Sequence, residues 1–227
     1  MAAASTPVLL AWSGGKDSAW TLHTLRQQRG YDVVALLTTI TADHDRSSMQ
    51  GVRRDVIRAQ TQAAGLPLLE ADIRAGGSND EYDAAMAAAL ADAARRWPGL
   101  RTVAFGDLFL EDIRAWRVQR CEAMGWHVLT PLFGRDTGAL AREMIAGGLR
   151  AGLCCVDTTQ LAGSFAGRDF DAALLADLPA HIDPCGENGE FHTCVRDGPM
   201  FAAPLRLRRG DTVLRDGRFA YTDFVLP

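Results

Sequence analysis

Residues 13–18, with the sequence SGGKDS, combine residue types that bind phosphate. The two glycines let the backbone approach phosphate oxygens without a Cβ in the way. The serines offer hydroxyl donors, and the lysine, the only one in the chain, adds a mobile positive charge. The segment joins the apolar residues 8–12 to a helical pattern, so free backbone N–H groups and the positive end of a helix dipole would converge there. We predict a phosphate-binding loop formed by Ser13, Gly14, Gly15, Lys16, Asp17 and Ser18.

The same residues exclude two better-known phosphate loops. The P-loop pattern G-x-x-x-x-G-K-[ST] fails because Leu10 stands at its first glycine position and Asp17 follows the lysine. The dinucleotide pattern G-x-G-x-x-G is also missing. Asp17 is an unusual residue beside an anion unless it binds Mg²⁺ or caps the helix. The alternative for the whole segment is a tight strand-to-helix turn with incidental polarity.

A second group of polar and turn-forming residues lies at residues 185–193, with the sequence CGENGEFHT. Taken alone, this segment is more typical of a plain turn whose charges are solvated. It also contributes to a set of four residues with zinc-ligand chemistry, namely His181, Cys185, His192 and Cys194. Their spacing, H-x₃-C-x₆-H-x-C, is not a familiar zinc pattern, so a metal stays an open alternative here.

The elements that position these residues alternate between strands and helices. Apolar runs predict strands at residues 8–12, 33–40, 66–73, 102–106, 127–132 and 152–156. Helical patterns lie between them at residues 18–28, 50–64, 80–96, 111–124 and 137–146. Several strands are continuously apolar, as expected for strands buried on both faces. The alternation predicts an α/β fold with a doubly wound, mostly parallel sheet, whose ligands bind beyond the carboxyl ends of the strands.

The C-terminal part of the chain has a different character. Residues 205–208, 212–215 and 218–225 predict short antiparallel strands, with a hairpin turn at Asp216 and Gly217. We expect a phosphate-binding domain over residues 1–135 and a smaller α+β substrate region over residues 136–227 that packs on it.

Composition limits the class of protein. The chain has 227 residues, of which 48% are hydrophobic and 23% charged, as in one globular domain with a modest appendage. The formal net charge of −4 argues against a nucleic-acid partner. No apolar run approaches the ~20 residues that cross a bilayer, and no signal peptide is recognisable. Five cysteines without a C-x-x-C pair suit reduced thiols, so we expect a cytoplasmic protein without a membrane partner.

Both motifs together resemble those of a known family. The SGGKDS loop resembles the signature of the PP-loop ATP pyrophosphatases, which cleave ATP between its α- and β-phosphates. Residues 185–193 resemble the second signature of the diphthine–ammonia ligase family, roughly C-G-E-G-G-E-[FY]-E-T. Gly106-Asp107 and Arg117 also stand in family order, and the resemblance spans residues 8 to about 201. The chain departs from the pattern at Asn188 for glycine, His192 for an acid and Gln119 for glutamate, which leaves the second substrate open.

The resemblance implies an ATP-dependent ligase that adenylates an acceptor carboxylate or carbonyl, releases pyrophosphate and joins the acceptor to ammonia or an amine. It implies that Lys16 contacts the phosphates, that Asp17 holds Mg²⁺, with Asp107 as a further ligand, and that Arg117 clamps a phosphate or a carboxylate. Glu187 and Glu190 would bind the amine or take its proton. The residues expected to contact substrate are Gly186, Asn188, Gly189, His192 and Thr193.

Two other functions stay open on the same fold. A tRNA-modifying PP-loop enzyme would need a basic surface and sulfur-transferring cysteines that this composition does not indicate. A nucleotide-binding sensor without catalysis is the second alternative, and the acidic residues of the second signature argue mildly against it. The expected ligands are ATP, Mg²⁺, an unidentified acceptor and ammonia or an amine, and a homodimer is compatible with the sequence.

Overall fold

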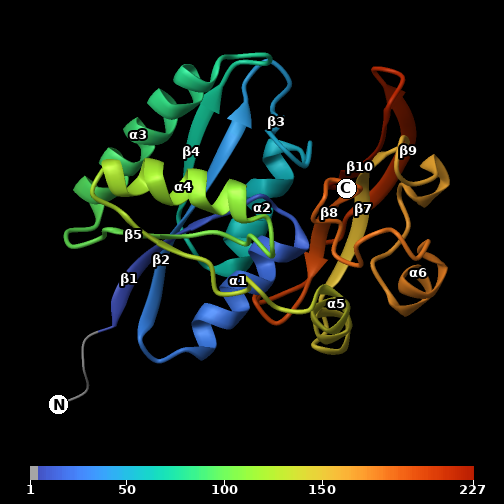
Figure 1. The fold of residues 1–227 in the computed structure, drawn as a ribbon, viewed down its shortest axis with the longest axis horizontal. Helices are drawn as coiled ribbons and strands as arrows, with labels where there is room; N and C mark the ends of the chain where they lie inside the picture. Colours follow the sequence, from blue (N-terminus) through green and yellow to red (C-terminus); the bar gives the residue numbers. More distant parts are fainter. Residues whose placement is uncertain (1–4) are drawn as a thin grey trace.

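Two β-sheets lie next to each other in the computed structural model, which describes residues 5–227 (Figure 1). The first sheet has the strand order β4-β2-β1-β5-β6, and the short β3 pairs antiparallel with the end of β2. The other pairings in this sheet are parallel. Its strands are β1 (Thr6–Ala11), β2 (Tyr31–Thr41), β3 (Arg46–Ser47), β4 (Leu68–Ile73), β5 (Thr102–Ala104) and β6 (His127–Leu129).

Helices cover both faces of this parallel sheet. Apolar residues of α1 (Lys16–Gln27) and α2 (Arg54–Ala64) pack into one core, and those of α3 (Asn79–Arg96) and α4 (Glu111–Ala123) pack into a second core on the opposite face. The predicted doubly wound α/β fold is therefore confirmed. The chain winds outward from β1 to β2 and β4 and then crosses back to β5, so the order of the strands switches between β1 and β5. Ligand sites of such sheets lie at this switch point, beyond the carboxyl ends of the strands.

The second sheet is antiparallel, with the order β8-β7-β10-β9. Its strands are β7 (Arg150–Asp157), β8 (Phe191–Asp197), β9 (Arg208–Arg215) and β10 (Phe219–Val225), and the nearby helices are α5 (Thr137–Ala146), the 3₁₀ turn η1 (Gly163–Phe165) and α6 (Ala172–Asp177). Asp216 and Gly217 have φ angles of 51° and 63°, as a tight hairpin turn between β9 and β10 requires, which confirms the predicted turn.

Two expectations about this region are wrong, and one strand was missed. The strand predicted at residues 152–156 belongs to the antiparallel sheet as β7, because its neighbours β8 and β10 come from the C-terminal part of the chain. No strand forms over residues 205–207, which follow Pro204; one longer strand, β9, begins at Arg208 and pairs along β10. The strand β8 was not expected, since its polar residues hide the alternating pattern of a strand.

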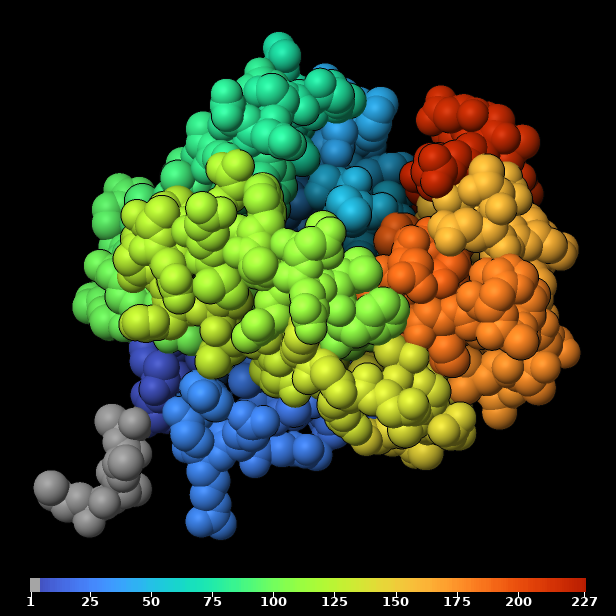
Figure 2. All heavy atoms as spheres, viewed as in Figure 1, coloured from blue at the N-terminus to red at the C-terminus, as the bar shows by residue number. Residues whose placement is uncertain are grey.

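The two sheets share one hydrophobic core. Buried residues of β1, such as Val8 and Leu10, belong to the same cluster as Leu153 of β7 and Val195 of β8. In the space-filling view the blue-to-green half of the chain meets the orange-to-red half directly (Figure 2). The N-terminal half therefore does not finish burying its apolar surface by itself. Within residues 5–227, none of the helices has the length and apolar character required to cross a membrane.

Candidate functional site

The phosphate loop lies between the end of β1 and the start of α1 and is folded on itself by its serines. The hydroxyls of Ser13 and Ser18 are 3.1 Å apart, and the Ser18 hydroxyl donates to the carbonyl oxygen of Gly15 at 3.0 Å. Gly14 has a φ of +81°, and a Cβ at this position would lie 2.5 Å from the Ile57 side chain, so the turn requires glycine. Local hydrogen bonds and the glycine thus shape the loop, and α2 limits the space beside it.

Backbone groups of the loop also bond to β8, which lies far away in the sequence. The Lys16 N–H donates to the Thr193 hydroxyl at 3.0 Å, and the Val195 N–H donates to the carbonyl oxygen of Gly14 at 3.0 Å. The Gly15 N–H donates to the Ser13 hydroxyl at 3.3 Å. The expectation that the loop N–H groups are free is therefore wrong at Gly15 and Lys16. Thr193, expected at the substrate, bonds to the loop backbone and also lines the cavity described below.

The start of α1 still suits an anion. Its N-cap residue, Gly15, makes no side-chain capping bond, as is also the case at α2 and α4, whereas α3, α5 and α6 are capped by the side chains of Ser78, Asp136 and Asp171. The Gly15 and Lys16 N–H groups are bonded to the hydroxyls of Ser13 and Thr193, so the positive end of the helix dipole is what α1 still offers to an anion. A phosphate group is the kind of ligand that a helix N-terminus in this state binds.

Lys16 is held as a buried cation at the junction of the two sheets. Its side chain is 2% exposed, and its Nζ lies 2.8 Å from the Asp17 carboxylate. The same Nζ lies 5.8 Å and 5.6 Å from the ring centres of Phe170 and Phe191, within the range of cation–π attraction. Burial is the largest single influence and disfavours the charged form, but the surrounding acidic groups, foremost Asp17, together outweigh it and raise the pKa of Lys16. The site therefore keeps a fixed positive charge.

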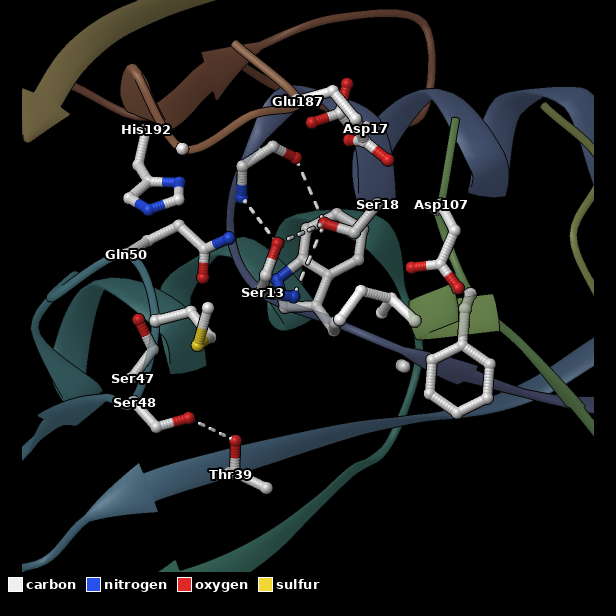
Figure 3. A pocket seen from close by; sticks show the side chains of 18 of the residues that line it. Ser13, Asp17, Ser18, Thr39, Ser47, Ser48, Gln50, Asp107, Glu187 and His192 are labelled. Carbon is white, nitrogen blue, oxygen red and sulfur yellow. Dashed lines mark hydrogen bonds between the residues drawn. The ribbon is translucent and has the colours of Figure 1, made fainter. Parts of the chain in front are cut away.

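One cavity of about 630 Å³ brings the two predicted motifs together. Its volume lies within the range of small-molecule sites, roughly 300–1,000 Å³. The predicted residues that line it are Ser13, Gly15, Lys16, Asp17, Ser18, Asp107, Arg117, Gly186, Glu187, Asn188, Gly189, His192 and Thr193. Gly14 and Glu190 do not line it. Gly14 faces α2, and the side chain of Glu190 is buried inside the second motif, where it bonds to Asp183. Figure 3 shows the Ser13–Ser18 pair between the acidic residues on one side and His192 and Gln50 on the other.

Asp107 and Arg117 form an ion pair in the lining of the same cavity, and each keeps one buried polar atom without a partner among residues 5–227. Their nearest side-chain atoms are 3.5 Å apart, and the guanidinium lies 4.6 Å from the ring centre of Phe105. Asp107 Oδ2 and Arg117 Nε are buried and have no hydrogen-bond partner among residues 5–227. Burial raises the pKa of Asp107, while the nearby guanidinium of Arg117 lowers it. Such unpaired donors and acceptors need partners, and a bound ligand would supply them.

The two glutamates of the second motif have different surroundings. Glu187 lines the cavity and accepts the Leu108 N–H at 2.8 Å, which ties the second motif to the segment before α4. Burial raises the pKa of Glu187 to about 7, and the negative charge of Asp17 adds to the shift. Glu190 is 1% exposed and accepts the Asp183 N–H and the Asn188 side-chain N–H, each at 3.0 Å. Glu190 and Asn188 therefore shape the second motif from within.

His192 is a neutral residue in the cavity. Burial is the main reason why its pKa falls to about 4, and the positive charge of Lys16 lowers it further. Its imidazole thus offers one N–H donor and one nitrogen acceptor at neutral pH. A neutral His192 therefore stands where the diphthine–ammonia ligase pattern has an acid, which would carry a negative charge.

Several lining residues were not predicted from the sequence. Polar ones come from the end of β2 and the segment after it, namely Thr39, Ser47, Ser48 and Gln50. Apolar ones form a wall that includes Leu37, Tyr82, Met86, Phe105 and Trp116. No glycine-rich or charged motif marks either set. Their only signal in the sequence is their place after the carboxyl ends of β2 and β5, because ligands of parallel sheets bind there.

The four residues considered as a zinc set point to different partners. The His181 ring lies 3.4 Å from the carbonyl oxygen of Gln160, and the Cys185 thiol donates to the carbonyl oxygen of Thr137 at 3.4 Å. Cys194 lies near the Gln60 amide instead. In the described part of the chain, no three His, Cys, Asp or Glu side chains gather as metal ligands.

Comparisons with known proteins agree with the joining of the two motifs. The sequence profile of the diphthamide synthase N-terminal domain matches residues 6–128, and that of the diphthamide synthase C-terminal domain matches residues 136–218. A diphthine–ammonia ligase of Schizosaccharomyces pombe is 29% identical over 220 residues, which cover 88% of this chain and 36% of that protein. A diphthine–ammonia ligase of Danio rerio is 28% identical over 235 residues, which cover 94% of this chain and 91% of that protein.

The chain thus spans about a third of the yeast relative and most of the zebrafish relative. Both matched profiles, taken together, account for the parallel sheet and most of the antiparallel one. On this evidence the chain belongs to the diphthamide synthase family.

Proposed function

We propose that this protein is an ATP-dependent ligase that adenylates an acceptor carboxylate and then joins it to ammonia or an amine. One observation carries the proposal: the phosphate loop and the second motif line a single cavity from opposite sheets. An adenylating ligase needs its nucleotide and its acceptor side by side in this way, because the acceptor oxygen must reach the α-phosphorus. The family relatives, named as diphthine–ammonia ligases, support the same reaction class.

The lining of the cavity suits the phosphates at one place and the adenine ring at another. Lys16 and the uncapped start of α1 suit the phosphates. The apolar wall with Tyr82, Met86 and Trp116 offers a surface for the adenine ring, since flat aromatic groups pack well against such side chains. The predicted domain division, with the nucleotide mainly on residues 1–135, is part of this proposal, whereas the acceptor side of the cavity takes residues from both regions.

Mg²⁺ fits the acidic side of the cavity. Asp17 Oδ1 and Asp107 Oδ2 are buried oxygens without hydrogen-bond partners in residues 5–227, and Asp17 raises the pKa of Asp107, so their charges interact. Mg²⁺ usually takes one or two carboxylates and fills its other positions with substrate phosphates and water. Bound there, the ion would neutralise charge on the departing pyrophosphate.

Each chemical step then has a protein group beside it. An acceptor carboxylate oxygen attacks the α-phosphorus, the bond to the bridging oxygen breaks, and pyrophosphate leaves. The amine nitrogen next attacks the activated carbonyl carbon, and AMP leaves with the acyl–oxygen bond electrons. Glu187, whose pKa of about 7 suits proton transfer at neutral pH, takes the proton that the amine releases. Arg117 balances the negative charge of the phosphates or of the carboxylate.

The products of ATP test the proposal. The protein is incubated with ATP labelled at the α-phosphate, Mg²⁺, ammonium and glutaramate as the acceptor carboxylate, and we expect labelled AMP and free pyrophosphate. Lys16→Ala should lower the rate by about 10²–10³-fold, the usual effect of removing a charged group from phosphate chemistry. Arg95→Ala, a change on the exposed face of α3, should leave it unaltered. Products of ADP and phosphate would contradict the proposal.

A further inference from the structure

One end of the cavity is lined by polar side chains without charge. It is formed by Thr39, Ser47, Ser48, Gln50 and His192, and we call it the Gln50–His192 end. Figure 3 shows these residues on one side of Ser13, away from Asp17, Glu187 and Asp107. With the nucleotide placed along the phosphate loop and the apolar wall, this end is the part of the cavity left for the acceptor.

Gln50 has an unused acceptor atom at this end. Its side-chain oxygen is buried and has no hydrogen-bond partner among residues 5–227. Its backbone is fixed, because its carbonyl oxygen accepts the Cys154 thiol of β7 at 3.3 Å. Unpaired buried acceptors are rare in proteins, and each calls for a ligand or water. A bound molecule that replaces water at this end could supply the missing donor to the Gln50 amide.

His192 offers a complementary group from β8. No hydrogen bond joins its ring to another residue of the described chain, although the residue is half-buried. Burial lowers its pKa to about 4, which keeps it neutral near pH 7, and among charged groups Lys16 has the strongest effect on this pKa. Glu190 acts in the opposite sense but more weakly, and it does not line the cavity.

A positive group placed at this end would find no balancing charge. The lining residues there supply only dipoles, and Lys16 repels a second cation. A buried charge without a partner is costly, whereas a buried amide or hydroxyl that satisfies Gln50 and His192 is not. The position of His192, where the diphthine–ammonia ligase pattern has an acid, makes this end less suited to a cation than the pattern implies.

We propose that Gln50 and His192 form an uncharged subsite that selects an acceptor carrying a neutral hydrogen-bonding group, such as an amide or a hydroxyl, near the carboxylate that is activated. This inference rests on the proposed function, because it takes the cavity to hold both ATP and an acceptor. It goes further by naming the class of acceptor.

Two carboxylates of similar length test the subsite. Glutaramate ends in a neutral amide and γ-butyrobetaine ends in a fixed positive charge. Their binding is measured by NMR titration on the full chain with Mg²⁺ and a non-cleavable ATP analogue. We expect glutaramate to bind at least about tenfold more tightly to the native protein, because the cation meets no counter-charge. The His192→Glu variant should reverse the preference, and His192→Gln, which is neutral, should keep it.

The Gln50→Leu variant adds a separate readout. It should weaken the binding of glutaramate and leave the affinity for γ-butyrobetaine unchanged. A merely structural role of Gln50 would change both affinities. Equal or tighter binding of γ-butyrobetaine to the native protein would overturn the inference, as would an unchanged ratio in His192→Glu. Failure of both acids to bind would overturn the assignment of this end as the acceptor subsite. None of these results depends on turnover, so the AMP-forming reaction stands or falls separately.

Discussion

A glutamine outside the phosphate loop holds the loop in place. Gln60 of α2 is fully buried, and its amide N–H groups donate to the carbonyl oxygens of Gly14 at 3.0 Å and Val195 at 2.7 Å. Its side-chain oxygen accepts the Trp12 indole N–H at 3.1 Å. One side chain thus joins the end of β1, the loop and β8. Lys16, by contrast, depends on the shape that these contacts impose.

Replacing Gln60 by leucine tests this role. Gln60→Leu keeps the volume but leaves the Trp12 indole and the Val195 carbonyl without their partners. We expect a loss of roughly 2–4 kcal/mol in the free energy of unfolding, measured with urea, and weaker ATP binding. Gln62→Leu, on the exposed side of the same helix, is the matched control. A Gln60→Leu protein as stable as the native one would show that the loop holds its shape unaided.

A glycine at the end of β5 lets the loop and the acidic side of the cavity approach each other. A Cβ on Gly106 would lie 2.9 Å from the Asp17 backbone carbon and 3.1 Å from the Ser18 nitrogen. Gly106→Ala should therefore push back the start of α1, cost about 1–3 kcal/mol of stability and weaken nucleotide binding. Gly30→Ala meets no atom of residues 5–227 within 4 Å and serves as the control. Calorimetric titration with ATP compares the two, and equal affinities would refute the close approach.

At the scale of elements, ion pairs fasten α2 to the edge of the parallel sheet. The Glu70 carboxylate of β4 accepts bonds from Arg54 at 2.7 Å and 3.1 Å and from Arg58 at 2.8 Å and 2.9 Å. These two guanidinium groups, foremost Arg58, lower the pKa of Glu70 to about 2. Since α2 also carries Gln60, this contact helps to position the helix that supports the loop.

The lowered pKa of Glu70 has a consequence for stability in acid. A carboxyl group with a depressed folded-state pKa stabilises the protein above its ordinary pKa, and this contribution is lost as the pH falls from about 4.5 to about 2. Glu70→Gln should remove roughly 2 kcal/mol at neutral pH, a figure kept low because Arg58 is 59% exposed. Urea unfolding near pH 7 and pH 3 should show a smaller acid-induced loss in Glu70→Gln than in the native protein. Glu122→Gln, an exposed change without an ion pair, should show the native loss.

At the scale of the whole molecule, the two sheets behave as parts of one structure. They share a core that includes Val8, Leu10, Leu153 and Val195, and β8 bonds directly to the phosphate loop. The predicted boundary at residue 135 thus separates the parallel sheet from the antiparallel one. The shared core argues against two domains that fold independently.

The shared core predicts how the chain unfolds. The full chain should show one cooperative transition by calorimetry, because neither sheet buries its apolar face alone. A fragment of residues 1–135 should expose the core face of β1, bind a hydrophobic dye and lack a sharp transition. Two separate transitions in the full chain, or a fragment that unfolds cooperatively, would contradict this prediction.

Local patterns were enough to predict part of this protein. The phosphate loop, the alternation that builds the parallel sheet and the hairpin turn at Asp216 and Gly217 are all specified by residues close together in the sequence. Glycine, strand and helix preferences act over a few residues, so the sequence reveals them directly. Helix α5 was placed at its observed bounds for the same reason.

Contacts between distant residues decided the rest. Lys16 and Thr193 are 177 positions apart, and no local pattern shows that β8 supports the loop, that Gln60 joins them or that Glu190 is buried beneath the second motif. The uncharged end at Gln50 and His192 also exists only because β8 and the segment after β2 meet. The sequence by itself determined where the glycine-rich loop between the first strand and the first helix forms. The packing of the second sheet against the first decided what surrounds this loop, because burial and long-range pairing depend on the whole fold.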